Sequence, residues 1–238
     1  MSAMSSPAAN PSPRSGPFLL VIGIVFLVTA GLMIIAAIRA DPFVSRWVLT
    51  SATPPVKRAA QFLSKSGEGQ WPIGLGLVIM IVGWTLGRCD WRRAGLAIVV
   101  ATVVAGGAAI TVRAATGRAR PSNTIEQGWF GPYHNGQWSA FRHAYSSFPS
   151  GHAATAAGFA VALACVARRW GWASLFWMTG VGWSRICLEA HSFSDVIAGL
   201  LFGLATALLV LRSFGWPRLE NPKCCPGAVK SFGSHNLL

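Results

Sequence analysis

Charged residues are scarce in this sequence. Asp, Glu, Lys and Arg make up only 11% of its 238 residues, whereas in a soluble domain they supply about a quarter. Hydrophobic residues make up 53%, and the mean hydropathy is +0.48. No polar block is long enough to bury a core of its own, which excludes a separate soluble domain and favours a single membrane-embedded bundle.

The sequence also lacks the ligand patterns of metal sites and disulfide frameworks. It has five cysteines, an odd number, at spacings that fit neither zinc nor paired disulfides. Its seven acidic residues form none of the carboxylate clusters that Mg²⁺ sites use. We therefore predict no metal and no other cofactor. Cys224 and Cys225 follow the last apolar segment and are interpreted as unmodified tail cysteines, with acylation as the alternative.

Negative charge is the scarcer sign. The 20 Lys and Arg outnumber the seven Asp and Glu, so that the formal net charge is +13 and the sequence pI is near 11.0. This balance can indicate nucleic-acid binding, but the basic residues lie between apolar runs rather than along one polar face. Their distribution argues against nucleic acid as a partner and indicates anionic membrane lipids or an anionic substrate.

Six apolar runs predict an all-α fold, an integral-membrane six-helix bundle. They are residues 17–38, 71–87, 94–112, 153–167, 170–183 and 196–211. The first is uncharged and long enough to cross a bilayer. Its alternative, a cleaved signal peptide, typically has an apolar core of only about 7–15 residues. The last three runs are short against the ~20 residues of a spanning helix, and they become spans only if the flanking residues lie in the membrane interface.

The runs divide the chain into a disordered N-terminal tail (1–17), a six-span domain (18–215) and a cytoplasmic C-terminal tail (216–238). The domain has outer loops at 39–70 and 113–151, and the first of these is expected to form two short amphipathic helices on the membrane surface, or a solvated loop. An inner N-terminus leaves short basic segments inside, as in most membrane proteins. We expect the bacterial inner membrane, with the active site facing the periplasm or exterior.

Three clusters of polar residues stand at the edges of these apolar runs. They are Arg113 with Arg120-Pro121, then Pro149-Ser150-Gly151-His152, then Ser184-Arg185 with His191 and Asp195. No predicted span separates the first cluster from the second, and two separate the second from the third. All three clusters are therefore expected at the same outer, non-cytoplasmic membrane face, where they can form one site.

The clusters contain the groups that bind a phosphate ester. Arg113, Arg120 and Arg185 supply guanidinium forks that match phosphate oxygens and stay charged. Ser150 and Gly151 precede an apolar helix, whose N-terminus offers free backbone N–H groups to an anion. Gly151 would let the backbone approach the phosphate, and Ser150 would cap the helix or bind a phosphate oxygen.

The clusters also contain groups for hydrolysis. If a helix begins near His191, then Asp195 lies on the same face four residues later. The carboxylate can accept the Nδ1 proton and leave Nε2 free to attack phosphorus. His152 can protonate the leaving alkoxide. Water would then release phosphate from a phosphohistidine, and no step requires a metal.

These residues resemble the type 2 phosphatidic acid phosphatase superfamily, whose signature is Lys-x6-Arg-Pro, Pro-Ser-Gly-His and Ser-Arg-x5-His-x3-Asp. The match covers residues 113–195, and Arg113 replaces the family's Lys. The resemblance implies a membrane lipid phosphatase with His191 as nucleophile, Asp195 as its orienting partner and His152 as general acid. The phosphate would be held by Arg113, Arg120, Ser150, Gly151 and Arg185. The implied substrate is a phospholipid or isoprenoid phosphate or diphosphate.

Two alternatives remain open at this stage. A phosphotransferase would use the same site with a lipid or sugar hydroxyl in place of water, and a channel or scaffold would retain the fold without activity. Residues of the outer loop outside the signature, among them Arg118, His134, Arg142 and His143, are interpreted as solvated. The loop aromatics are expected to line a lipid entrance or to rest on lipid headgroups.

Overall fold

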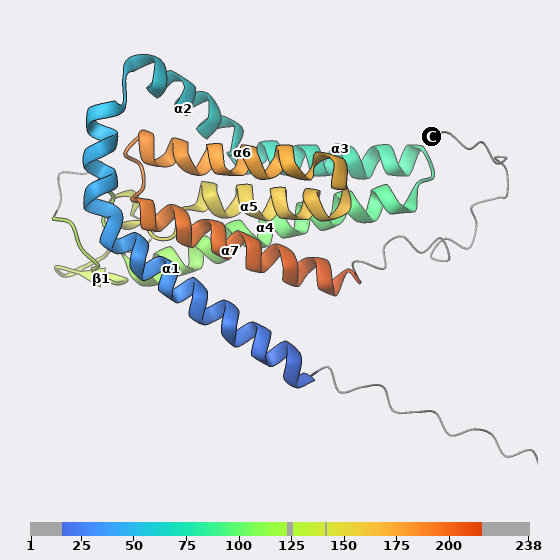
Figure 1. The fold of residues 1–238 in the computed structure, drawn as a ribbon, viewed down its shortest axis with the longest axis horizontal. Coiled ribbons are helices and arrows are strands. Elements are labelled where there is room, and N and C mark those ends of the chain that lie inside the picture. Colours follow the sequence, from blue (N-terminus) through green and yellow to red (C-terminus); the bar gives the residue numbers. More distant parts are fainter. Residues whose placement is uncertain (1–15, 123–125, 141, 216–238) are drawn as a thin grey trace, which may run out of the picture.

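The computed structural model describes residues 16–122, 126–140 and 142–215 (Figure 1). Most of this part is helical, as the sequence predicts. Its α-helices are α1 (Gly16–Ser51), α2 (Pro54–Ser66), α3 (Gln70–Thr85), α4 (Cys89–Thr116), α5 (Gly151–Val166), α6 (Arg168–Cys187) and α7 (Phe193–Ser213). Between α4 and α5 lie a small hairpin, β1 (Tyr133–His134) with β2 (Gln137–Trp138), and the 3-10 turn His143–Tyr145. The predicted C-terminal tail and all but the last two residues of the predicted N-terminal tail lie outside the described residues.

Helix α1 is longer than the predicted first span. The apolar run ends at Ile38, but the helix continues to Ser51 with Pro42 inside it. A proline removes one backbone hydrogen bond and favours a bend, and Figure 1 shows α1 changing direction along its length. The preceding residue, Asp41, is buried against the rest of the bundle, so a charge that seemed to end the span instead lies within the helix.

The predicted loop 39–70 is therefore corrected. Its first part belongs to α1, and one further helix, α2, follows instead of two short surface helices. Pro54 and Pro55 begin α2 rather than interrupt a helix, because proline is tolerated in a first helical turn. Helix α2 is amphipathic, as expected, and it packs mainly against α6 with Ala60 and Ser64 buried.

Small residues allow the bundle helices to approach one another closely. The buried face of α4 carries Ala97, Ala101 and Ala105. On α7, a Cβ atom at Gly203 would collide with the carbonyl group of Ala154 on α5. Such contacts are typical of helices in membranes, where close backbone approach replaces the hydrophobic effect. Helix α5 packs against α4, α6 and α7, and it forms the centre of the bundle.

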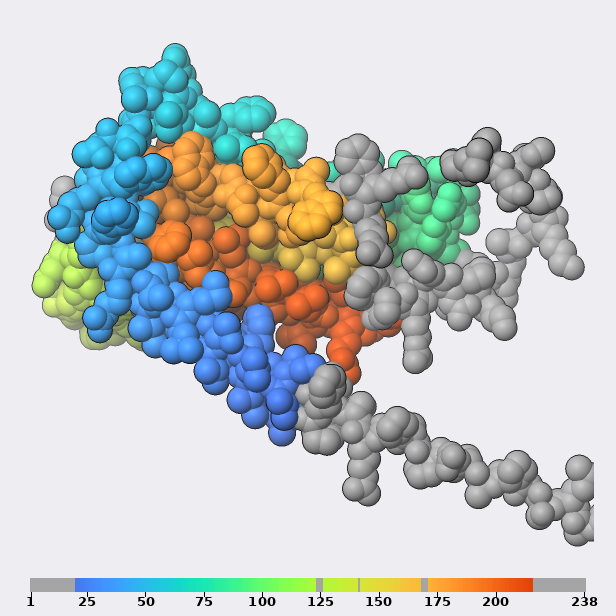
Figure 2. All heavy atoms as spheres, in the orientation of Figure 1, coloured from blue at the N-terminus to red at the C-terminus, as the bar shows by residue number. Residues whose placement is uncertain are grey.

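The surface of the bundle is suited to lipid. Three helical segments are long and apolar enough to cross a membrane, namely Leu20–Ser51, Cys89–Thr116 and Phe193–Ser213. Leu27 and Phe176 expose 69% and 81% of their surface, and Figure 2 shows α1 along one edge of the molecule with much of its surface uncovered. Extensive apolar surface of this kind is stable against hydrocarbon rather than water. The chain is an integral membrane protein.

All three sequence clusters lie at one end of the bundle. Helix α4 ends and α5 begins there, and the turn from α6 to α7 lies beside them (Figure 1). Gly117 ends α4 in the left-handed conformation, at φ 56°. A side chain there would collide with the carbonyl group of Gly131. The absence of a Cβ lets the segment after α4 lie against residues 128–131 and run towards the start of α5.

Candidate active site

Hydrogen bonds to main-chain carbonyl groups join the three clusters. The Ser150 amide donates to the Asp195 carbonyl oxygen at 2.8 Å, which connects the second cluster with the third. Arg113 Nε donates to the Pro149 carbonyl oxygen at 2.9 Å, which connects the first with the second. Segments far apart in the sequence therefore meet, as the number of spans between them predicts.

Arg120 lies between two carbonyl groups and is only 7% exposed. Its Nη1 donates to Ala190 O at 3.3 Å and its Nη2 to Ser146 O at 3.2 Å. Its Nε is buried without a hydrogen-bond partner among the described residues. Burial lowers the pKa of the Arg120 guanidinium, and the Asp195 carboxylate partly opposes this shift. An arginine remains cationic under such a shift, so Arg120 presents an incompletely paired buried charge.

Arg185 contributes a second incompletely paired cation. Its Nη1 donates a hydrogen bond to Ser64 Oγ, which comes from α2. Its Nε is also buried without a partner in the described part of the chain. Buried polar atoms are normally satisfied, so two orphaned Nε–H groups at one site indicate that a ligand with oxygen acceptors completes it. No pattern in the sequence indicated that Ser64 contacts Arg185.

Ser150 and Gly151 open α5 as predicted. Ser150 is the N-cap, and its hydroxyl oxygen accepts from the Ala153 amide at 3.5 Å. Gly151 also has a steric role that the sequence did not predict, while its contact with phosphate stays a prediction. A Cβ atom at this position would collide with the Arg113 guanidinium. The missing side chain therefore makes room for an arginine of the site.

His191 is 2% exposed and lies just before the N-cap of α7. Its Nδ1 is 2.8 Å from the Ser147 carbonyl oxygen and 3.7 Å from Asp195 Oδ2. A carbonyl oxygen only accepts, so Nδ1 carries the proton and a neutral ring leaves Nε2 with a free lone pair. Burial lowers the pKa of His191 to about 4, although Asp195 opposes the shift. The imidazole is therefore neutral near pH 7.

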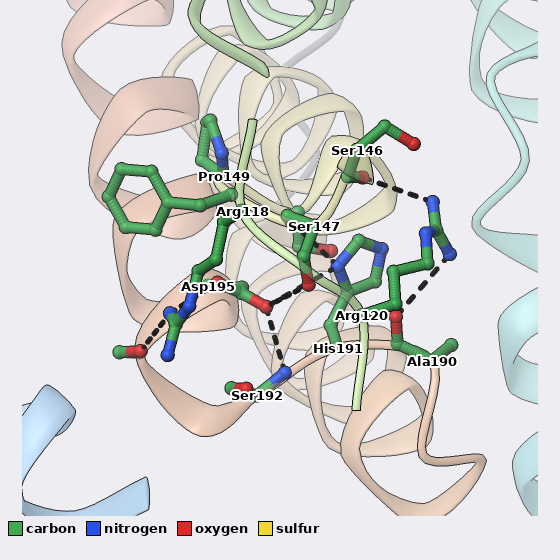
Figure 3. Close-up of polar contacts among 12 residues, drawn as sticks. Arg118, Arg120, Ser146, Ser147, Pro149, Ala190, His191, Ser192 and Asp195 are labelled. Atoms are coloured by element: carbon green, nitrogen blue, oxygen red, sulfur yellow. Dashed lines mark hydrogen bonds and ion pairs between the residues drawn. The ribbon is translucent and has the colours of Figure 1, made fainter. Parts of the chain in front are cut away.

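Asp195 supports His191 less directly than the sequence suggested. It occupies the third position of α7 in a capping box, where its Oδ2 accepts from the Ser192 amide at 2.8 Å. The same oxygen accepts from Ser147 Oγ at 2.5 Å. The hydrogen bond to His191 Nδ1 is made by the Ser147 backbone instead. Asp195 thus positions Ser147, and the carbonyl group of Ser147 orients the His191 ring (Figure 3).

The interpretation of Arg118 as a solvated loop residue is wrong. Its side chain is 13% exposed, and its Nη1 donates to Asp195 Oδ1 at 2.6 Å. Its Nη2 donates to Asp41 Oδ2 at 2.8 Å, and its guanidinium lies 4.8 Å from the centre of the Trp129 ring. Sequence reasoning missed Arg118, Asp41 and Ser147 because none belongs to the signature. The one available signal was the presence of charge in a chain that has little.

The remaining histidines occupy different positions. His152 lies half-buried in the first turn of α5, within electrostatic range of His191 and of the three arginines Arg113, Arg120 and Arg185. His143 is exposed in the outer loop, and the charge of Arg120, more than any other group, lowers its pKa. His134 stacks on Phe130 at 4.3 Å between ring centroids. His152 is the histidine that joins His191 at the cationic centre.

Comparisons with known proteins agree with this geometry. A family model described as the PAP2 superfamily matches residues 94–218. A protein named Lipid A 1-phosphatase from Rhizobium johnstonii is 30% identical over 193 residues, which cover 71% of this chain and 77% of that protein. A protein of the same name from Rhizobium etli is 29% identical, with 68% and 78% covered.

A solved structure has the same fold. It is that of a transmembrane PAP2 type phosphatidylglycerolphosphate phosphatase from Bacillus subtilis, with a TM-score of 0.55 and 21% sequence identity. The match covers 82% of this chain and 94% of the other. Together with the family model and the curated relatives, the site geometry leads to one assignment: the chain belongs to the PAP2 superfamily and is a membrane phosphatase.

Proposed function

We propose that this protein hydrolyses the phosphate headgroup of a membrane lipid through a phosphohistidine at His191. The observation that carries the proposal is the pair of buried Nε–H groups of Arg120 and Arg185, which have no partner within residues 16–122, 126–140 and 142–215, at a site whose neutral histidine has its Nδ1 bound to a carbonyl group. Buried N–H donors are normally hydrogen-bonded, and the oxygens of a phosphate group would supply acceptors for these two. A neutral imidazole with a free Nε2 supplies the nucleophile.

The phosphate would be bound by cations and by a helix terminus. Arg113, Arg120 and Arg185 supply charge-assisted donors, which neutralise a dianion more effectively than neutral donors do. The first turn of α5, after the Ser150 cap, adds backbone N–H groups with a partial positive charge. These donors would also stabilise the additional negative charge that develops on the phosphoryl oxygens in the transition state.

The reaction has two steps. In the first, the Nε2 lone pair of His191 forms a bond to phosphorus while the ester P–O bond breaks, and His152 gives its proton to the leaving alkoxide. A dianion bound among the arginines offsets their charge and favours the proton that His152 must carry. In the second, His152 takes a proton from water, which attacks phosphorus and releases inorganic phosphate and free His191. Neither step uses a metal.

An apolar cavity in the same bundle supports a lipid substrate. It has a volume of about 520 Å³, lies between α3, α5 and α6, and is lined among others by Trp71, Leu75, Phe159 and Trp177. Trp177 Nε1 donates to Ser66 Oγ at 2.9 Å, close in sequence to the Ser64 that contacts Arg185. We propose that this cavity receives part of the lipid, and that the 1-phosphate of lipid A is the first substrate to test.

The test is phosphate release by purified protein in detergent. The panel contains lipid A, phosphatidylglycerophosphate, phosphatidic acid and undecaprenyl diphosphate. His191→Ala is expected to abolish release while the protein still elutes as a folded species, and His134→Ala is the matched control in the outer loop. Full activity of His191→Ala on every substrate would refute the phosphohistidine step. Loss of activity in EDTA with recovery in Mg²⁺ would refute a metal-independent reaction.

The same assay separates hydrolysis from phosphotransfer. Substrate with a labelled phosphate yields labelled inorganic phosphate in hydrolysis and a labelled second lipid or sugar in transfer. We further propose that the site faces the outside of the bacterial inner membrane, because the basic residues Arg88, Arg92 and Arg93 lie where α4 begins after α3, at the opposite end of the bundle. Membrane-impermeant labelling of a cysteine introduced at Trp138 should succeed in intact spheroplasts if this orientation holds.

A further inference from the structure

A second group of buried charges lies beside the site but outside the signature. It consists of Asp41 on α1, Arg118 after α4, and Ser194 with Asp195 at the start of α7. Arg118 forms ion pairs with both Asp41 and Asp195, and each of these partners is 77 residues away from it in the sequence. Nothing in the chemistry proposed above requires either residue to touch the phosphate, because the carboxylates around Arg118 occupy its donors.

The contacts of this group are complete and short. Asp41 Oδ1 accepts from the Ser194 amide at 2.8 Å, and Asp41 Oδ2 accepts from Ser194 Oγ at 2.6 Å. Arg118 Nη1 is shared between Ser194 Oγ and Asp195 Oδ1, both at 2.6 Å. Trp129 covers the guanidinium plane. Asp195 and Ser194 are fully buried, and the side chains of Asp41 and Arg118 are 12% and 13% exposed.

Stability alone is a weak reason for such a group. Buried ion pairs often contribute no more than well-packed apolar residues would, since desolvation offsets the attraction between the charges. This group also places a carboxylate inside α1, the least buried of the three candidate membrane spans. Its geometric effect is clearer, because two carboxylates on opposite sides of one planar fork fix the orientation of both.

That orientation is passed on to the histidine. Arg118 binds Oδ1 of Asp195, which leaves Oδ2 for Ser147 Oγ and the Ser192 amide. Ser147 in turn presents its carbonyl oxygen to His191 Nδ1. Figure 3 shows Arg118 beside Asp195 on one side of His191, with Arg120 on the other side. A rotation of the Asp195 carboxylate would therefore displace the segment that fixes the histidine tautomer.

We infer that Asp41 and Arg118 are positioning residues, which hold Asp195 and, through Ser147, the reactive tautomer of His191. The inference rests on the proposed function, because it assigns these residues to the nucleophile of that reaction. It also gives α1 a role in catalysis, because Asp41 connects this helix through Arg118 to the Asp195 carboxylate. A displacement of this helix would reach the nucleophile through two ion pairs.

The experiment compares kcat with KM in Arg118→Gln, Arg118→Lys and Asp41→Asn, with Arg142→Gln as matched control. Arg142 is an exposed arginine of the same loop, whose Nη1 donates to Gln137 Oε1 at 2.9 Å and whose guanidinium lies 5.9 Å from the centre of the Tyr145 ring. Arg118→Gln should lower kcat about 100-fold, the loss expected when a reactive group is misplaced by about 1 Å, with KM and inhibition by inorganic phosphate unchanged. Arg118→Lys should recover part of the loss, and Asp41→Asn should lower kcat about tenfold.

A purely structural pair would behave differently. It would lower the thermal unfolding midpoint and leave the kcat of the folded fraction unchanged. If single variants do not fold, the double variant Asp41→Asn with Arg118→Gln removes both members of the pair and avoids an uncompensated charge between them; its kcat must still fall. Wild-type kcat in a folded variant, or an increase in KM alone, overturns the inference. His191→Ala in the same series separates the two hypotheses, because its full activity would refute the proposed function instead.

Discussion

Two arginines of one loop, two residues apart, lie in opposite electrostatic surroundings. Arg118 is bound by two carboxylates, a hydroxyl and an aromatic ring. Arg120 is bound only by carbonyl oxygens and has a buried Nε without a partner among the described residues. A cation whose donors are bonded orients the groups around it, whereas a cation with an unbonded buried donor is suited to bind a ligand. The difference divides the site into a paired region around Arg118 and a cationic region around Arg120.

The largest effect is expected in the cationic region. Arg120→Gln removes charge and donors that would contact the transferring phosphoryl group, so kcat/KM should fall about 1,000-fold, as when a transition-state donor is lost. Inhibition by vanadate and by inorganic phosphate should weaken in parallel. This behaviour contrasts with that expected of Arg118→Gln, and equal inhibition constants for Arg120→Gln and wild type would remove the distinction between the two regions.

The next largest effect is expected from filling the space beside Gly151 that the Arg113 guanidinium occupies. Gly151→Ala adds a Cβ atom where the Arg113 guanidinium lies, so the guanidinium must move and kcat/KM should fall about 100-fold. Gly107→Ala is the control, because a Cβ atom at that α4 glycine meets no atom within 4 Å. Steady-state rates of the two variants provide the comparison. Equal rates would show that Arg113 has room to shift without loss.

A smaller, graded effect is expected from pH. The pKa of His191 is lowered to about 4 by burial, and protonation removes the Nε2 lone pair. The free-enzyme kcat/KM should therefore be insensitive to His191 near pH 7 and fall about tenfold per unit below pH ~4. The substrate's own ionisation near pH ~6 is measured separately by phosphorus NMR and divided out. A residual acidic limb near pH 6.5 would contradict a buried, neutral nucleophile.

The smallest effect is expected outside both regions. Lys57 on α2 and Glu189 beside the α6–α7 turn form an exposed ion pair at 3.4 Å. Exposed pairs contribute about 0–1 kcal/mol, so Lys57→Met should leave kcat/KM within about twofold of wild type and barely change the thermal unfolding midpoint. A large loss of activity would instead show that the position of α2 over the site depends on this pair.

Much of the site was predictable because its chemistry is local in the sequence. Ser150 caps α5 and Gly151 follows it, as their types and order indicate. Arg120 and His191 occur at signature spacings, and both lie at the cationic centre. The segment 39–51 was not predictable in the same way. The charge of Asp41 and the ring of Pro42 are normal signals for the end of a helix, and only the distant partners of Asp41 explain why α1 continues.

The sequence by itself determined a helical membrane protein and the end of the bundle at which polar residues gather, and it predicted which of these residues bind phosphate and catalyse its release. These properties follow from apolar run length and short-range spacing, which act within one or two helices. Only the tertiary structure decided that a backbone carbonyl of Ser147 holds His191, and that Arg118 joins Asp41 to Asp195. These partners come together through packing between segments up to 77 residues apart. A local sequence pattern does not indicate which two charged side chains will be buried next to each other.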